Sequence, residues 1–466
     1  MIHIFKYTNL WKSSMMKCLL LIVWALVSCE DFVDVDPPNN QLTGSLVFKD
    51  VATVDAALAN IYGQLRDEGL INGGLSGLAY QLGHYTDELS LYSTSQPGIQ
   101  LFYDNNLLAS NSTVLNLWSS SYNLIYDSNK IIEGVQSATS LPQEDKDRVL
   151  GEAYFIRAFI HFYLVNLFGD IPYIDTTDYR VNSKISRMDI DLVYQKLIDD
   201  LKIAKALLSA NDADVNRVRP NTWVVTSLLA RVYLYNQNWD LALSEATEVL
   251  SSGDYILNTD ITQVFLKNST ETLWQFDTGA SNANTIDALT YIFTSGPPPN
   301  SALADYFISS FEPGDIRLSN WIGEVTNGTD IWYYPFKYKR NQSGMTEERS
   351  IVFRLAELYF IAAEANVQLG HIADALVFLN AIRQRANLEP VSTGDTTELL
   401  EAIYQERRME FFSEMGHRFF DLKRTGQADG QLSVVKPNWK STDVLLPIPE
   451  SELLLNPNLN PQNDGY

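Results

Sequence analysis

The stretch LAELYFIAAEA, residues 355–365, decides the fold, because it is an apolar helix former with small residues along one face. Ala363 is followed twelve residues later by Ala375, with a short polar turn between them. Ala230 and Ala242 repeat this spacing in an earlier segment. Small residues at such positions let two antiparallel helices approach closely. The pattern therefore predicts two helix pairs of one type.

This spacing is similar to that of the tetratricopeptide repeat. Residues 151–168 have the pattern of a strongly apolar helix that should end at Gly169, with Pro172 just beyond. This helix could begin a further helix pair, although the spacing there is less clear. The copies lie far apart, so the chain is not a simple tandem solenoid, and two ordinary helical hairpins would also fit the spacing. We predict a mainly α fold.

Three more segments, 51–65, 118–135 and 192–208, have apolar residues at helical spacing. Residues 69–117 and 254–350 lack this periodicity, apart from a strand-like run at 273–276. Irregular stretches of such length inside a compact domain are usually functional. A rigid helical scaffold that carries long loops suits a binding protein.

The N-terminus has the pattern of a secretory signal. A short apolar run, 19–25, follows Lys17 and leads to Leu26-Val27-Ser28-Cys29. The run is too short to cross a bilayer, which takes about 20 apolar residues. Ending in small residues and Cys, it resembles a bacterial lipoprotein signal, which implies cleavage before Cys29 and lipidation there. An ordinary signal that happens to end at a cysteine is the alternative.

The lipoprotein interpretation gives a signal peptide at 1–28 and a lipidated tether at 29–40. Translation from Met1 or from Met15 or Met16 yields the same mature chain. The formal net charge of −23 argues against nucleic acid and anionic lipid surfaces as partners. Cys18 leaves with the signal and Cys29 should carry lipid, so no disulfide is expected.

The sequence predicts no enzyme, no catalytic residue, no cofactor and no metal site. The five histidines fit no metal-binding motif, and phosphate-binding or nucleophile-elbow motifs are absent from the sequence. Residues 212–216 start like a calcium loop, but Arg217 replaces the required Gly and Trp223 replaces the bidentate Glu.

Glu357 and Glu364 share one helix face, about 10 Å apart along the axis. A glycosidase needs two carboxylates that flank one bond. We expect these two instead to pair with the basic helix at 406–410, since buried charges need partners.

Two aromatic clusters in polar surroundings form the candidate ligand site. Sugar rings stack their C–H faces on aromatic rings, while Asn, Asp and Arg bond to hydroxyls; peptides can use the same surfaces. The alternative is that these aromatics fill a core, which we expect of Trp118, Tyr122, Trp223, Trp239 and Trp274. The predicted ligand-binding residues are Tyr80, Tyr92, Phe102, Tyr103, Asn105, Tyr291, Trp321, Trp332, Tyr333, Tyr334 and Arg340.

Several segments, each weak alone, together resemble the SusD/RagB family of outer-membrane nutrient-binding lipoproteins from Bacteroidota. With Cys29 they span nearly the whole chain, and the close at Gly-Tyr suggests that the chain is complete. They are GEAYFIRA at 151–158, FGDIP at 168–172, RLAELYFIAAEA at 354–365, ERRMEF at 406–411, GHRFFDL at 416–422, LPIP at 446–449, NPNL at 456–459 and QNDGY at 462–466.

The resemblance implies four tetratricopeptide-like pairs that support irregular loops, with a helical region at 41–250 and a second region at 251–466. It implies that the Asn/Pro-rich tail docks on the body, and that ligand-facing loops follow Asp87-Glu88 and Trp274. It also implies a lipid-anchored protein of the outer membrane, facing the cell exterior. The implied partner is a SusC-like TonB-dependent transporter, which receives captured oligosaccharide. Capture of oligopeptides, or a mainly structural gating lid, are the alternatives.

Overall fold

The structure, a computed structural model, describes residues 47–93, 95–210 and 215–466. Residues 48–466 form one compact unit. The predicted signal, Cys29 and the tether lie outside the described residues, as do residues 212–214 of the rejected calcium loop. No helix in the described ranges combines the length and apolar character needed to cross a membrane.

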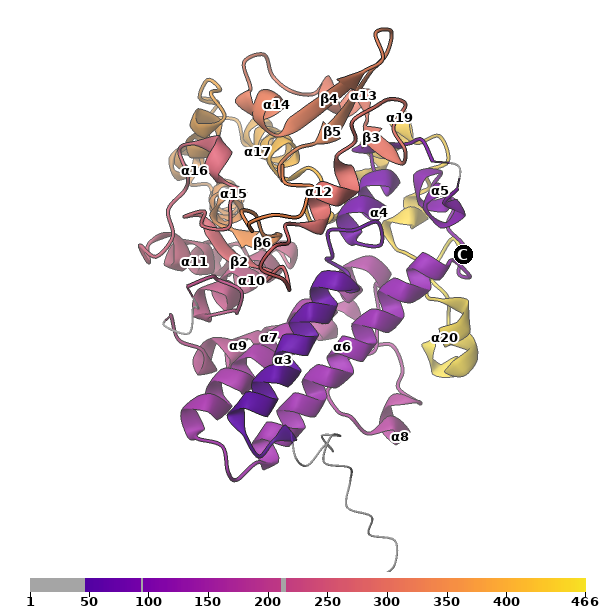
Figure 1. Cartoon of the computed structure of the whole chain (residues 1–466), viewed down its shortest axis with the longest axis vertical. Helices are drawn as coiled ribbons and strands as arrows, with labels where there is room; N and C mark the ends of the chain where they lie inside the picture. The colour runs from indigo at the N-terminus through magenta and orange to yellow at the C-terminus, as the bar shows by residue number, and fades with distance from the viewer. Residues whose placement is uncertain (1–46, 94, 211–214) are drawn as a thin grey trace, which may run out of the picture. The chain divides into compact units, whose positions relative to one another are not determined.

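The body is a row of long helices in which each packs against the next (Figure 1). α6 contacts α7, α7 contacts α9, and the row continues through α10, α11, α15 and α16. The long helices are α3 (Val51–Asp67), α6 (Ser112–Ser137), α7 (Gln143–Phe168), α9 (Ile190–Leu207), α10 (Thr222–Tyr235), α11 (Trp239–Leu250), α15 (Leu355–Gln368), α16 (Ile372–Arg385) and α17 (Thr396–Phe411).

The small residues that predicted the helix pairs lie at the helix contacts. Ala230, Ala242, Ala363 and Ala375 are all fully buried, and α10 packs on α11 as α15 packs on α16. α7 ends where predicted, because Gly169 at φ 75° adopts a conformation that other residues rarely take. The mainly α fold and both helix pairs are confirmed.

Two small antiparallel sheets complete the fold. One has the strand order β1-β3-β5-β4 and the other pairs β2 with β6. In the first sheet Leu89 pairs with Leu303, Leu303 with Tyr333, and Val325 with Trp332. The strands are β1 (Leu89–Leu91), β2 (Thr272–Gln275), β3 (Ser301–Leu303), β4 (Ile322–Thr326), β5 (Ile331–Pro335) and β6 (Ile351–Arg354).

The two regions predicted to be irregular contain more regular structure than expected. Helices of four to eight residues are too short to show helical periodicity in a sequence. The predicted strand at 273–276 is confirmed as β2. The short helices of these regions are α4 (Leu78–Tyr85), α5 (Pro97–Tyr103), α12 (Ile286–Tyr291), α13 (Asp305–Ile308) and α14 (Ile316–Asn320).

Glu357 and Glu364 are paired, but not with the helix that we expected. Glu357 accepts from Arg231 of α10 through two bonds of 2.6 Å. Glu364 accepts from Arg424 of α18 (His417–Arg424) at 2.6 and 2.8 Å. α15 faces α10, so Arg231 is the arginine within reach of Glu357. The expected pairing with residues 406–410 is therefore wrong, while the expectation of buried ion pairs holds.

The tail docks on the body, as the family resemblance implied. Leu446 donates its N–H to the carbonyl of Leu167, at 2.8 Å. Asn463 donates its side-chain amide to the carbonyls of Phe168 and Leu446, at 2.8 and 2.7 Å. The hydroxyl of Tyr466 donates to the carbonyl of Leu445, at 3.0 Å. These hydrogen bonds act together with the buried side chains of Leu446, Ile448 and Leu459 to fasten the tail.

Candidate ligand-binding site

A partly exposed aromatic surface lies on the four-stranded sheet, and we call it the Tyr92–Trp332 surface. It consists of Tyr92 directly after β1, Tyr103 at the end of α5, and Trp332 and Tyr334 on β5. Tyr92 is 43% exposed, and the other three rings are partly exposed. The side chain of Trp332 lies close enough to the Tyr92 hydroxyl to lower its pKa, so residues 240 positions apart in the sequence meet here.

Glycine makes room for the indole of Trp332. A Cβ built on Gly296 would lie 1.9 Å from Cζ3 of Trp332, so the ring packs directly on the backbone of residue 296. Gly323 of β4 gives similar room to Tyr334, whose ring carbon would lie 2.3 Å from a Cβ there. Real Cβ atoms are not found this close to other atoms, so both rings depend on glycine neighbours.

Strand alternation divides the aromatic run of β5 between two faces of the sheet. Trp332 and Tyr334 share one face, where Tyr334 also packs against Phe293, with ring centroids 5.0 Å apart. Tyr333 points to the other face and lines a separate hollow with Ile322 and Glu324. Tyr333 is therefore not part of the Tyr92–Trp332 surface.

Buried arginines anchor the segment that carries Tyr92. Asp87 lies just before β1 and accepts from Arg418 of α18 at 2.8 Å and from Arg408 of α17 at 2.9 Å. Although burial raises the pKa of Asp87, the two guanidiniums hold it below its ordinary value. Directly after β1, the N–H groups of Tyr92 and Ser93 both donate to the carbonyl of Asn300, which immediately precedes β3. Tyr92 is thus fixed to both the helical body and the sheet.

Carboxylates accompany the exposed rings. Burial raises the pKa of the Tyr92 hydroxyl, and the negative charge of Asp305 nearby raises it further. Asp330 adds a smaller effect in the same direction. A surface that combines aromatic faces with carboxylate acceptors fits a neutral ligand that carries both hydroxyl groups and apolar faces.

The contact between Gly296 and Trp332 makes a testable prediction. Gly296→Ala should displace the indole, since the new methyl group would occupy the same space, and weaken ligand binding by about tenfold while Trp332 itself is retained. Titration calorimetry measures this effect. Gly344→Ala is the matched control, because a Cβ there meets no atom within 4 Å. Equal binding by the two variants would contradict the arrangement.

Five of the predicted ligand residues are packed in the interior. Trp321 is 1% exposed and donates its indole N–H to the carbonyl of Ile261, at 3.2 Å. The hydroxyl of Tyr80 shares a 2.7 Å hydrogen bond with that of Ser301, at the start of β3. We therefore place these side chains in the interior and leave them out of the Tyr92–Trp332 surface. The five are Tyr80, Phe102, Asn105, Tyr291 and Trp321.

Asn105 and Arg340, two of the predicted ligand-binding residues, are held by other contacts. Asn105 adopts φ 49°, a conformation that Asn tolerates better than most residues, and donates its amide to the carbonyl of Tyr85. Arg340 is exposed, but its guanidinium is bonded to Glu347 at 2.8 Å. Because this ion pair holds Arg340 at Glu347, we leave it out of the Tyr92–Trp332 surface.

Glu88, the neighbour of Asp87, gives a prediction for pH dependence. Burial, followed by the charge of Asp87, raises its pKa from 4.5 to about 7. The folded protein thus holds a proton that the unfolded chain has lost, so the stabilisation is complete below about pH 4.5 and lost as pH rises through 7. Glu88→Gln should remove this loss. Between pH 4 and pH 8, the free energy of unfolding should therefore fall by roughly 1–3 kcal/mol less in the variant than in the wild type.

Urea unfolding at the two pH values measures this difference. The exposed Glu324 of β4 serves as the control position, and Glu324→Gln should track the wild type at both. A Glu88→Gln protein whose stability follows the wild type across this range would contradict the buried, protonated state.

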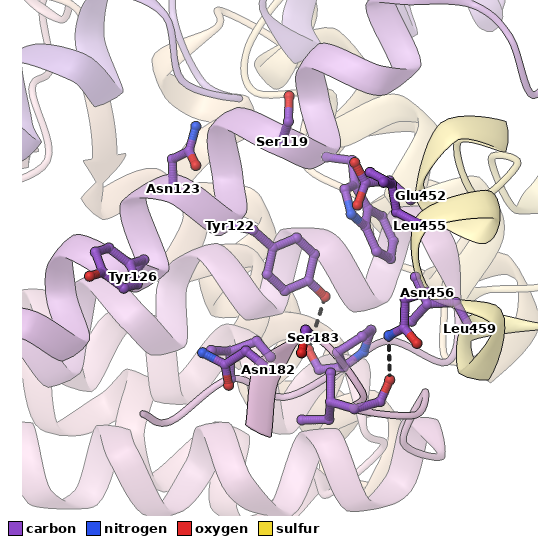
Figure 2. Close-up of a pocket in the computed structure, with 14 residues that line it drawn as sticks. Ser119, Tyr122, Asn123, Tyr126, Asn182, Ser183, Glu452, Leu455, Asn456 and Leu459 are labelled. Carbon is purple, nitrogen blue, oxygen red and sulfur yellow. Dashed lines mark hydrogen bonds between the residues drawn. The ribbon is translucent and has the colours of Figure 1, made fainter. Parts of the chain in front are cut away.

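Sequence reasoning missed a pocket of about 520 Å³ beside α6 (Figure 2). Three segments far apart in the chain form it: α6, residues 172–185 and the tail at 452–459. Trp118 is buried there as predicted, whereas Tyr122 lines the pocket and is only partly buried. No local signal marks this pocket, because it exists only once the tail has docked.

Comparisons with known proteins agree with this architecture. A family described as "Starch-binding associating with outer membrane" matches residues 31–234, and the SusD family matches residues 277–466. A SusD-like protein of Formosa agariphila is 24% identical, over 96% of this chain and 98% of its own length.

Solved structures share the fold. A SusD superfamily protein from Bacteroides vulgatus has a TM-score of 0.79 at 21% identity, covering 90% of this chain and 99% of its own. A laminarin-binding SusD-like protein has a TM-score of 0.75 at 24% identity, covering 89% and 99%. The two family matches together span both halves of the helical body, and the chain therefore belongs to the SusD/RagB family.

Proposed function

We propose that this protein captures oligosaccharides at the Tyr92–Trp332 surface and does not alter them chemically. The observation that carries the proposal is the junction of Tyr92 and Trp332, where two partly exposed rings meet beside Asp305. Aromatic faces offer stacking to sugar rings, and carboxylates accept bonds from hydroxyl groups.

Family membership supports the same ligand class. One solved relative of the same fold is named for binding laminarin, a glucan, and one matching family is described as starch-binding. These names favour oligosaccharides over peptides as the ligand class.

We infer further that Cys29 carries a lipid anchor in the outer membrane, and that the protein passes its ligand to a SusC-like TonB-dependent transporter. The signal-like segment that ends at Cys29 supports the anchor, and the family description supports the membrane. Mass spectrometry of the membrane-extracted protein would test the anchor. Co-purification from detergent-solubilised outer membranes would test the transporter.

Calorimetric titration of residues 30–466 tests the ligand class. The panel contains laminarihexaose, maltohexaose, cellohexaose and mannohexaose, with a tryptic digest of casein as the peptide arm. Saturable binding of at least one neutral hexasaccharide supports the proposal. Binding of peptides alone would transfer the assignment to peptide capture, and no binding in either arm would leave the gating lid as the better account.

A further inference from the structure

The pocket of Figure 2 has walls that are bonded to one another. The hydroxyl of Tyr122, on α6, donates to the carbonyl of Pro172, at 2.9 Å. On the tail, Asn456 donates its amide to the carbonyl of Ile185, at 2.8 Å. α6, the 172–185 segment and the tail thus hold a preformed cavity, and its volume of about 520 Å³ lies in the range of small-molecule sites.

Aromatic rings line one side of this pocket. Trp118 and Tyr122 pack with ring centroids 4.9 Å apart, and Trp118 is buried behind the wall. Tyr126, one turn further along α6, is 45% exposed. Figure 2 shows both tyrosines projecting from the same helix. The pocket thereby offers an aromatic face that water reaches.

Polar groups without charge line the other side. Asn182 of α8 (Tyr179–Asn182) donates its amide to the carbonyl of Thr176, at 2.8 Å. Its Oδ1 is buried and accepts no hydrogen bond from the described residues. This oxygen has almost no accessible surface in the open pocket, so Asn182 forms part of the wall and its Oδ1 does not face a ligand. Ser183 next to it, and Asn123 on α6, add exposed polar groups.

The charge of the lining selects among ligands. Among the described residues, no Lys or Arg lines the pocket, and Glu452 is the one ionisable acid that does. Burial raises the pKa of Glu452, and a hydrogen bond from the side chain of Trp118 acts against this. With no cation to pair with a carboxylate or sulfate, the pocket disfavours anionic ligands, while hydroxyl groups fit its acceptors.

We propose that this pocket is a second carbohydrate site, which holds one or two neutral glycosyl units of an oligosaccharide. It is distinct from the Tyr92–Trp332 surface: its residues come from α6, α8 and the tail, and it shares none with β1 or β5. The inference rests on the pocket residues alone and does not require ligand binding at the sheet.

The test uses residues 30–466 carrying Trp332→Ala, so that the sheet surface contributes little. Saturation-transfer NMR and titration are run with laminarihexaose, maltohexaose, cellohexaose and mannohexaose, and with trigalacturonic acid as the anionic probe. We expect at least one neutral hexasaccharide to bind and trigalacturonic acid to bind at least about tenfold more weakly. Binding by none of the four up to about 10 mM, or equal binding of the anionic probe, would overturn the proposal.

Two pocket variants locate the binding. Tyr126→Ala removes an exposed ring, and Asn123→Ala removes an exposed amide of the lining; each should weaken binding by about tenfold or more. Tyr179→Ala is the matched control, because Tyr179 is a 76% exposed tyrosine of α8 that does not line the pocket. Loss of binding in Tyr179→Ala, or none in Tyr126→Ala, would place the sugar elsewhere and overturn the proposal.

Discussion

Replacing Glu410 with Gln should lower the free energy of unfolding by roughly 3–5 kcal/mol, because it removes one member of a buried charge network. Glu410, on α17, has no exposed surface. It accepts from Arg354 at 2.5 Å, from Arg317 at 3.2 Å and from Arg385. The variant keeps the shape of the side chain but leaves three buried guanidiniums with one fewer negative charge.

The pKa of Glu410 explains why the effect should be large. Burial alone would raise it, but the guanidiniums of Arg385, Arg354 and Arg317 outweigh burial and hold it well below its usual range. Ionised Glu410 therefore stabilises the folded protein above pH 4.5, near the pKa of a glutamate in the unfolded chain, and this stabilisation is lost as pH falls. The penalty of Glu410→Gln should be complete at pH 7 and shrink in acid.

Urea denaturation followed by circular dichroism measures this penalty at pH 7. Glu401→Gln on the same helix is the control, since Glu401 is exposed and its change should stay within about 0.5 kcal/mol. A loss below about 1 kcal/mol in Glu410→Gln would mean that the network does not hold the C-terminal helices together.

Trp332→Ala should weaken oligosaccharide binding by roughly thirtyfold, or about 2 kcal/mol, as expected when a central aromatic contact is truncated. The indole lies on the backbone of Gly296 and beside the Tyr92 hydroxyl, so its loss removes a stacking face and leaves Tyr92 without a neighbouring ring. Trp332→Phe should restore part of the affinity, because it keeps a ring without the N–H donor.

Titration calorimetry with the tightest-binding hexasaccharide measures this effect. Ile331→Ala is the matched control: Ile331 precedes Trp332 on β5, is 50% exposed, and points to the other face of the strand. Tyr92→Ala provides a second, independent test of the same surface. Unchanged affinity in both Trp332→Ala and Tyr92→Ala would exclude this surface as the ligand site.

Local patterns predicted the scaffold well. Ala230 with Ala242, and Ala363 with Ala375, identify helix pairs because both members of each contact lie within one short stretch of sequence. Gly169 likewise ends α7 by a property of its own backbone. Such features depend on residue type and on short-range spacing, and both can be seen in the sequence itself.

The candidate site was harder to predict, because burial depends on distant contacts. Trp321 and Trp332 lie eleven positions apart in the sequence, yet Trp321 is buried against Ile261 while Trp332 reaches the surface beside Gly296. Nothing in the sequence around either tryptophan distinguishes them. The ion pairs were equally hard to predict: Glu357 pairs with Arg231, 126 positions away, whereas the sequence led us to expect the arginines of residues 406–410.

The central claim is that oligosaccharide binds between Tyr92 and Trp332. The most direct measurement is a crystal structure of residues 30–466 with the tightest-binding hexasaccharide of the panel. We predict a sugar ring stacked on Trp332 and within hydrogen-bond distance of Tyr92 or Asp305. A saturated complex with no sugar at these residues would contradict the account.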